Sequence, residues 1–276
     1  MNSPVDTQLK EIHLVVQSLY NRETTHLQSS PTSIVSINAV NFLAGQATTF
    51  ADAVLFLMED ARQPLNAPAA LLRTCLEAQA RANHIIAVAG NEREQRANEL
   101  IQLMNVGHDY YVTMAIQMTK GFTPDASNSL PRDLPYLPHI KRLTKNTDTS
   151  KLKALGKQYK LLGQNWSYGK VIGRKELLDP VWQNRSEAQR LQPELYVRYI
   201  QLCAFVHSDP ASLKLAPLLT TLSVAYTAVM AEIAALLCFF VALGKEKDQD
   251  LLNLKKSFIA FDVIEKILPK KNLPPS

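Results

Sequence analysis

Four polar side chains at helical spacing interrupt an otherwise apolar segment, PAALLRTCLEAQARANHIIAVAG, at residues 68–90. They are Arg73, Glu77, Arg81 and His84. Because an α-helix has 3.6 residues per turn, all four fall on one narrow strip of the helix surface. The strip either faces solvent, with i,i+4 ion pairs from Glu77 to both arginines, or lines a polar interior site. In the second case the arginines could stabilise phosphate charge, with Glu77 orienting them.

A histidine ends a second apolar segment, YVRYIQLCAFVHSDP, at residues 196–210. His207 falls in the last turn of the expected helix, where the helix dipole favours its protonated form. Asp209 follows closely enough to orient the ring. A histidine with a pKa near 7 in this setting could act as a general acid or base. The alternative is a histidine that only caps the helix.

Positive charge is concentrated in residues 132–175. This segment holds eleven Lys or Arg and two acidic residues, a net charge of +9, whereas the rest of the chain carries −4. Lys153, Lys157 and Lys160 recur at i, i+4 and i+7 and therefore share one helical face. Aromatic residues, including Trp166, are interleaved with these cations, a pattern that suits a phosphate backbone and unstacked bases. The alternative is a solvated helix face whose aromatic rings turn inward.

Several well-known catalytic patterns are absent from the sequence. There is no G-x-x-x-x-G-K-[ST], G-x-G-x-x-G, G-x-S-x-G or H-E-x-x-H. His84 and His207 lack the carboxylate spacing of a helical di-metal site. The three cysteines, Cys75, Cys203 and Cys238, lie in apolar helical segments, so we expect them to be core thiols. We therefore expect neither a metal nor a cofactor.

The elements that must position these residues are helices. The chain has 276 residues, 46% of them hydrophobic, and only 9 glycines, and no pair of strands with hairpin turn chemistry is evident. We expect an all-α fold, a multi-helix antiparallel bundle of about eight to ten helices without a sheet. The expected helices are 4–22, 34–62, 69–88, 92–120, 139–145, 150–162, 193–207, 217–243 and 246–267. The two residues linking 69–88 to 92–120, with Gly90 as a left-handed stop, predict an antiparallel hairpin.

We expect one helical domain over residues 1–276. Residues 122–192 form an irregular basic insertion with short helices and four glycines turning around Trp166, and residues 269–276 form a frayed tail. Residues 218–243 are apolar enough to span a bilayer, but Glu232 at the centre favours a buried core helix over a membrane span. Residues 1–30 lack a signal pattern, so we expect a cytoplasmic protein. The extensive apolar helix surface makes homodimerisation an expectation.

Three short motifs, in chain order, carry a resemblance to a known family. They are Arg73 with Glu77, the segment Asn165-Trp166-Ser167 with Gly169 and Arg174, and a Tyr-rich helix ending in Val206-His207-Ser208. The chain resembles an uncharacterised bacterial all-helical family over roughly residues 65–240. That family has no established chemistry, so the resemblance implies the fold alone. Ala204 stands where the family's terminus often has Ser.

A looser resemblance is to HEPN-type helical ribonucleases of bacterial toxin and phage-defence systems. Their signature places a histidine four to six residues beyond an arginine and a polar residue. In this chain Arg81 is too close to His84, and Arg198 is too far from His207. The segment from Arg132 to His139 matches in spacing but is broken by prolines, so we interpret that match as chance.

Two functions follow from these patterns. The first is a nucleic-acid- or phosphate-ligand-binding accessory or effector protein, of the kind found in phage-defence or toxin systems, which binds RNA or another nucleic acid through residues 132–175. The alternative is a metal-independent, HEPN-like ribonuclease with His207 as acid or base. Its candidate catalytic residues are Arg73, Glu77 and His207. The candidate binding residues are Arg81, His84, Lys153, Lys157, Lys160, Trp166, Tyr168, Arg174, Tyr199 and Asp209.

Overall fold

A computed structural model describes residues 4–58, 66–120, 149–166, 202 and 221–267 of the chain. Within these ranges the protein is all-helical, with seven α-helices and no strand, which confirms the expected fold class. The helices expected at 139–145 and 193–207 lie outside the described residues. The seven helices are α1 (Pro4–Ser29), α2 (Val35–Leu57), α3 (Asn66–Ile86), α4 (Gly90–Lys120), α7 (Thr149–Asn165), α11 (Thr221–Ala242) and α12 (Gln249–Ile267).

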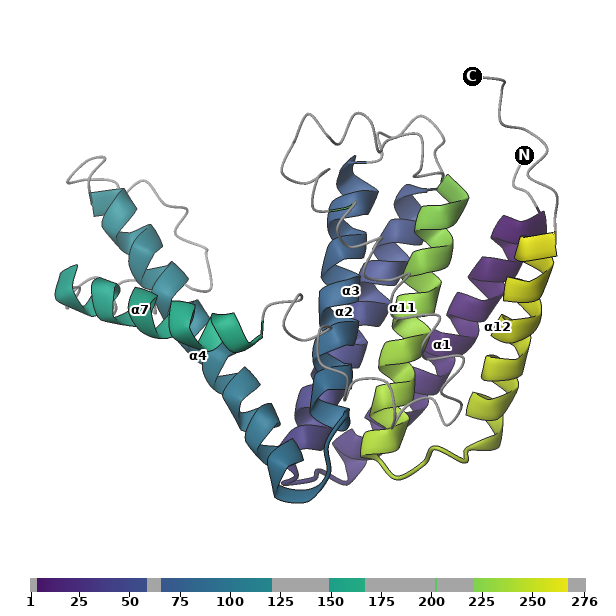
Figure 1. Cartoon of the computed structure of the whole chain (residues 1–276), viewed down its shortest axis with the longest axis horizontal. Helices are drawn as coiled ribbons and strands as arrows, with labels where there is room; N and C mark the ends of the chain where they lie inside the picture. Colours follow the sequence, from purple (N-terminus) through teal and green to yellow (C-terminus); the bar gives the residue numbers. More distant parts are fainter. Residues whose placement is uncertain (1–3, 59–65, 121–148, 167–201, 203–220, 268–276) are drawn as a thin grey trace.

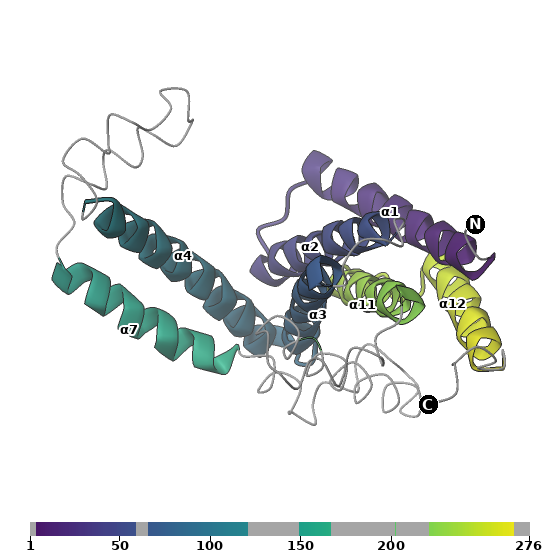
Figure 2. The same cartoon turned by 90° about the horizontal axis from the view of Figure 1, so that it is seen from above.

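Five of these helices form a bundle. α1, α2, α3, α11 and α12 run side by side, with α11 packed against α1, α2 and α3 (Figures 1 and 2). Every side chain of α11 from Val224 to Phe240 is buried. Alanines make up much of this stretch, and their small side chains let the neighbouring helices approach closely, while Phe239 and Phe240 are the largest fully buried side chains. α11 is therefore the core element of the bundle.

The termini of the bundle helices follow from capping and from buried contacts. The apolar stripe of α1, which includes Leu9, Val16 and Leu19, is buried as expected. The helix runs to Ser29 rather than to about residue 22, because Glu23 is buried and Leu27 packs against the core. Gly90, the first residue of α4, and Gly244, two residues after the end of α11, have positive φ angles of 59° and 68°. This backbone conformation favours glycine.

α4 and α7 form an arm that leaves the bundle (Figures 1 and 2). The chain reverses at Gly90, but α4 then diverges from α3, so the expected antiparallel hairpin exists only near the turn. The physical reason is that α4 pairs with α7 along the arm, where Leu103 of α4 lies beside Gly163 of α7. The arm holds α7 away from α1, α11 and α12.

Two described helices are long and apolar enough to cross a membrane by length and composition. They are α2, with a mean hydropathy of 1.3, and residues 223–242 of α11, with a mean hydropathy of 2.1. In the structure 94% of this apolar stretch of α11 is buried inside the protein. Core helices of soluble proteins pass the same test, so this observation is weak evidence for a membrane.

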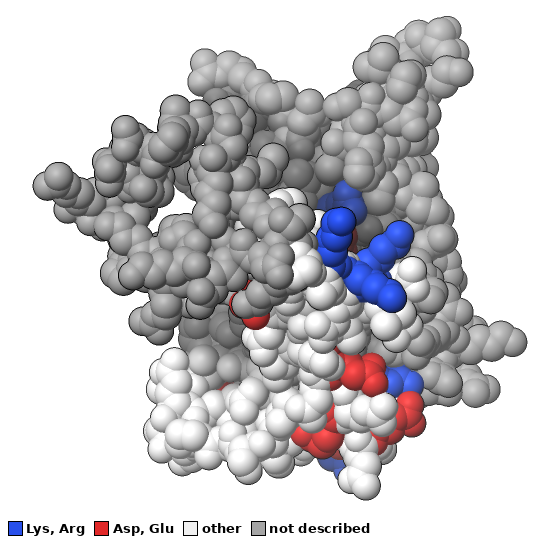
Figure 3. Space-filling model, turned by 90° about the vertical axis from the view of Figure 1, so that its left-hand side faces the viewer, with Lys and Arg blue, Asp and Glu red and all other residues white. Residues whose placement is uncertain are grey.

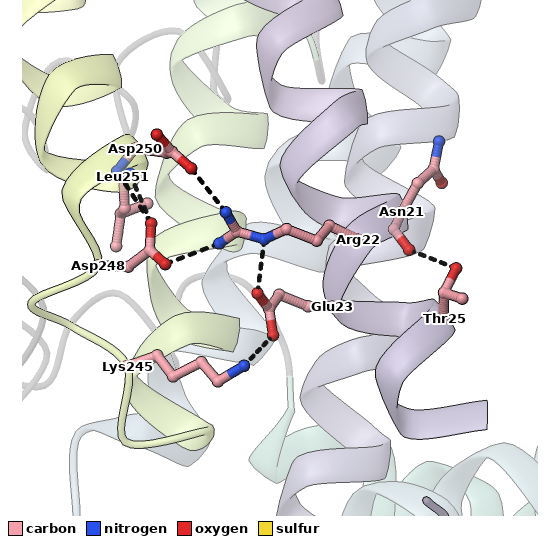
Figure 4. A network of polar contacts seen from close by, with 8 residues as sticks. All are labelled: Asn21, Arg22, Glu23, Thr25, Lys245, Asp248, Asp250 and Leu251. Atoms are coloured by element: carbon pink, nitrogen blue, oxygen red, sulfur yellow. Dashed lines mark hydrogen bonds and ion pairs between the residues drawn. The ribbon is translucent and has the colours of Figure 1, made fainter. Parts of the chain in front are cut away.

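A polar network ties α1 to the turn between α11 and α12 (Figure 4). The Arg22 guanidinium donates to Asp248 at 2.8 Å and to Asp250 at 2.7 Å, and its Nε donates to Glu23 at 2.9 Å. Lys245 Nζ donates to the other oxygen of Glu23 at 2.5 Å. Although burial opposes it, Asp248 has a lowered pKa, because backbone amides and Arg22 stabilise its carboxylate. Arg22 therefore connects carboxylates from two parts of the chain.

Replacing Arg22 by alanine is expected to lower the free energy of unfolding by about 2 kcal/mol. Hydrogen bonds to charged groups contribute about 1.5–3 kcal/mol, and Glu23 would keep only Lys245 as a cationic partner. Urea unfolding followed by circular dichroism measures the change. Lys256→Ala, at an exposed position of α12, should stay within about 0.5 kcal/mol of the wild type. Equal effects of the two substitutions would contradict the role assigned to Arg22.

Candidate functional site

The lysine face of α7, defined as Lys153, Lys157 and Lys160, is exposed to solvent. α7 contains four lysines and no acidic residue. Figure 3 shows a group of Lys and Arg side chains on one face of the molecule, with Asp and Glu side chains, and a few further cations, below it. The three lysines lie at i, i+4 and i+7 within one described helix and therefore share one face of it, and none of them forms an ion pair with a described residue.

One glycine on each helix, Gly156 of α7 and Gly107 of α4, sets how closely α7 packs on α4. The sequence predicted that Gly156 and Gly163 belong to a tight loop around Trp166, which is wrong, because both lie within the helix. A Cβ atom on Gly156 would come within 3.0 Å of the Tyr110 ring, so a larger side chain would push the helices apart. On α4, Gly107 has the same role, since a Cβ atom there would lie 2.8 Å from the Tyr159 ring. The glycines therefore permit close approach of the two helices.

The aromatic side chains of α7 do not share the lysine face. Tyr159 stacks on Tyr110 with ring centroids 5.7 Å apart, and Tyr111 contacts it edge-on at 5.6 Å. Trp166 is 2% exposed. The interleaving of cations and rings in the sequence thus becomes two separate faces, as the inward-turned alternative predicted. Burial, followed by a hydrogen bond and charge from Tyr111, raises the pKa of Tyr159, so its hydroxyl stays protonated.

The polar strip of α3 contains the two predicted ion pairs. Glu77 accepts from Arg73 Nε at 3.1 Å and lies 3.7 Å from Arg81 Nη2. All three side chains are partly exposed, and both Arg81 and Glu77 act electrostatically on Tyr159 of α7. The strip therefore faces the base of the arm. His84 differs from the other three members because it is buried.

A pocket of about 310 Å³ lies where α3, α4 and the end of α7 meet. We call it the arm pocket, and its lining is His84, Glu92, Gln95, Arg96, Glu99, Asn165 and Trp166. Arg96 is 7% exposed, and its guanidinium donates to the His84 carbonyl at 2.9 Å and to Glu92 at 2.7 Å. These bonds tie the first turn of α4 to the last turn of α3. Trp166 meets the His84 ring edge-to-face at 5.0 Å.

Arg96 also fixes which nitrogen of His84 carries the proton. The guanidinium Nη1 lies 3.2 Å from His84 Nδ1. A guanidinium has only donors, so Nδ1 must accept and the ring proton of neutral His84 is on Nε2. His84 is predicted from the sequence as a binding residue, whereas Arg96 is not. A signal was present, since Arg96 follows Glu92 at i+4 just after the turn at Gly90.

Five of the predicted site residues lie outside the described part of the chain. They are His207, Tyr168, Arg174, Tyr199 and Asp209. The structure therefore places Arg73, Glu77 and Arg81 on one strip of α3 and brings His84 into contact with Trp166 at the junction of α3 with the arm, and it says nothing of their distance from His207.

A second polar cluster, missed from the sequence, crosses the bundle. His13 of α1 bonds with Nδ1 to Glu232 of α11 at 2.9 Å and with Nε2 to Asp52 of α2 at 3.1 Å. Burial raises the pKa of Glu232 to about 7, although the hydrogen bond and charge of His13 work against that rise. Burial lowers the pKa of His13, but Glu232 and then Asp52 outweigh it and the net shift is upward. Glu232 and His13 are buried, so this cluster stabilises the packing of α1 rather than forming an open site.

No protein-family model, curated protein or solved structure matches this chain. The resemblances drawn from short motifs therefore stay expectations. Among the described residues, no group of three or more His, Cys, Asp and Glu side chains is placed to hold a metal ion.

Proposed function

We propose that this protein binds nucleic acid through the lysine face of α7. The observation that supports this most is the charge of α7, which has four lysines and no acidic residue, with Lys153, Lys157 and Lys160 exposed on an arm that leaves the bundle. A row of cations without acidic partners among the described residues is favourable beside phosphates, because binding releases the counterions condensed on the strand.

The length of the lysine face suits a short stretch of one strand. Lys153 and Lys160 are seven residues apart, which is about 10 Å along the helix axis at about 1.5 Å per residue. Each strand of a duplex carries one phosphate per about 3.4 Å of helix axis, so the row spans at most about three phosphates. Arg81 of α3 acts electrostatically on Tyr159 of α7, but it shares Glu77 with Arg73, so α3 adds little net positive charge to the row.

The test is a salt titration of binding to a fluorescently labelled twelve-nucleotide RNA, followed by anisotropy. The binding constant K falls as salt rises, and each phosphate contact contributes about −0.7 to the slope of log K against log salt for a single strand. Lys153→Gln/Lys157→Gln removes two such contacts, so its slope should be shallower by about 1.4. At about 0.1 M salt, affinity should fall roughly tenfold. Gel analysis of the RNA after incubation shows whether it has been cut, as the ribonuclease hypothesis requires.

The matched control is Lys247→Gln/Lys256→Gln. Both lysines are exposed, Lys256 on α12 and Lys247 in the turn before it, so this variant loses the same charge away from the arm. It should keep the wild-type slope and affinity. If both double variants weaken binding equally, net charge rather than the α7 face drives association, and the proposal is wrong. The same holds if the wild type binds no RNA.

A further inference from the structure

The arm pocket has polar walls built from buried side chains. His84 is 4% exposed and Arg96 is 7% exposed, and the two are bonded to each other. Gln95 and Asn165, both exposed, add amide groups at the rim. Gln95 Nε2 donates to Glu99 at 3.0 Å, which orients that carboxylate. The pocket therefore offers fixed donors and acceptors together with the indole of Trp166.

The chemistry of the lining selects its ligand. The carboxylates of Glu92 and Glu99 repel a phosphate, and the guanidinium of Arg96 opposes a cation. An apolar ligand would leave the polar walls without partners. A neutral, planar heterocycle with its own donors and acceptors fits these walls. About 310 Å³ is at the lower end of small-molecule sites, which is room for one base.

The position of the pocket connects it with the lysine face. Asn165, at the end of α7, is five residues beyond Lys160, which is about 7 to 8 Å along the helix axis. Because the buried Trp166 lies on the inward face and not on the lysine face, a strand whose phosphates follow the lysines would reach the pocket by passing around the end of α7. A nucleotide of that strand must leave the stack to enter, which a single strand does at low cost.

We propose that the arm pocket holds one unstacked base of a bound single strand and prefers a base with an exocyclic amino group. The inference rests on the proposed function and names its substrate class. The preference comes from Glu99 and Glu92, since carboxylates accept hydrogen bonds from an amino group such as cytosine N4. Uracil carries a carbonyl oxygen at that position, which would face a carboxylate without a proton between them.

The first experiment uses free cytidine and uridine, which carry no phosphate and differ at C4, where cytosine has an amino group and uracil a carbonyl oxygen, and at N3, which carries a proton in uracil alone. Trp182 is replaced by phenylalanine, so that Trp166 is the one tryptophan left in the chain. Cytidine should change the Trp166 fluorescence saturably, and uridine should bind at least tenfold more weakly, the usual scale of one lost polar match. Lys247→Gln/Lys256→Gln, at exposed positions away from the arm, should leave cytidine binding unchanged. Equal binding of the two nucleosides, or no saturable change, overturns the proposal.

A substitution within the pocket tests the source of the preference. Glu99→Gln keeps the size of the side chain but supplies an amide that can also donate, so cytidine and uridine should bind within about threefold of each other. The control is Asp109→Asn, which removes an exposed carboxylate from the same helix outside the pocket and should preserve the preference. Loss of the preference in both variants would overturn the role of Glu99.

Binding of labelled oligocytidine and oligouridine separates this inference from the proposed function. Both strands should depend on the lysine face, and oligocytidine should bind more tightly. If both bind equally and with lysine-dependent affinity, the proposed function stands and the pocket inference is wrong. If cytidine binds but neither strand does, the proposed function fails, and with it the assignment of the pocket to a base of a strand.

Discussion

Replacing His13 by alanine is expected to lower the free energy of unfolding by about 3–5 kcal/mol, the usual cost of removing one partner of a buried ion pair. Glu232 is 0% exposed at the centre of α11, and His13 bonds to it at 2.9 Å. Without the imidazole, the carboxylate must either stay charged inside the core or hold a proton, and both are costly at neutral pH. Urea unfolding at pH 7.5 measures the loss.

A double substitution distinguishes the ion pair from simple packing. His13→Leu/Glu232→Leu removes both polar groups and keeps similar volumes, so it should recover most of the stability lost in His13→Ala. Val16→Ala, at a buried position on the same face of α1, is the packing control and should lose about 1–2 kcal/mol. If His13→Ala costs no more than Val16→Ala, the histidine is not the partner on which Glu232 depends.

Stability is expected to fall as pH rises from about 5 to 8, by an amount that depends on Glu232. Its pKa is raised from 4.5 to about 7 by burial, so the folded state holds the proton over a range where the unfolded state has lost it. The stabilising contribution is therefore complete below 4.5 and is lost as pH rises through about 7. The pKa of His13 is also raised, from 6.5, so its contribution falls in the same direction above that value. The shift at Glu232 corresponds to about 3 kcal/mol.

Comparison with Glu232→Gln isolates this effect. Glutamine keeps an acceptor for His13 but does not titrate, so the stability of the wild type relative to this variant should fall by about 3 kcal/mol between pH 5 and 8. Glu246→Gln, at an exposed position, is the control and should follow the wild-type curve. Parallel curves for the wild type and Glu232→Gln would show that Glu232 does not titrate in this range.

The helices could be predicted from the sequence because their signals are local. The apolar stripe of α1, the stop at Gly90 and the lysine spacing of α7 each depend on residues within a few turns. The ion pairs from Glu77 to Arg73 and Arg81 are local for the same reason, since they join residues four apart. Cys75 and Cys238 are buried as expected, because their helices are apolar on several sides.

The divergence of α4 and the arm pocket could not be predicted. Both depend on which helix packs against α4. The contact between Gly107 and Tyr159 joins residues far apart in the sequence and produces no periodic pattern in either segment. For the same reason the glycines of α7 were assigned to a loop, although they serve close packing inside a helix. The sequence predicts Trp166 to be a binding residue, with inward-turned aromatic rings as the alternative, and the packing of Trp166 against His84 buries it.

The buried cluster of His13 and Glu232 lies between these cases. A carboxylate in the middle of an apolar helix requires a partner, and a histidine within the buried stripe of the first helix is a reasonable candidate, so each half of the pair was visible. The two residues are 219 positions apart in the sequence, and the packing of α1 on α11 brings them together. The sequence alone determined the helices, their apolar faces and the charge of α7, because these follow from near neighbours. The tertiary structure decided which polar groups meet, because hydrogen bonds and ion pairs between helices depend on distances that no local pattern encodes.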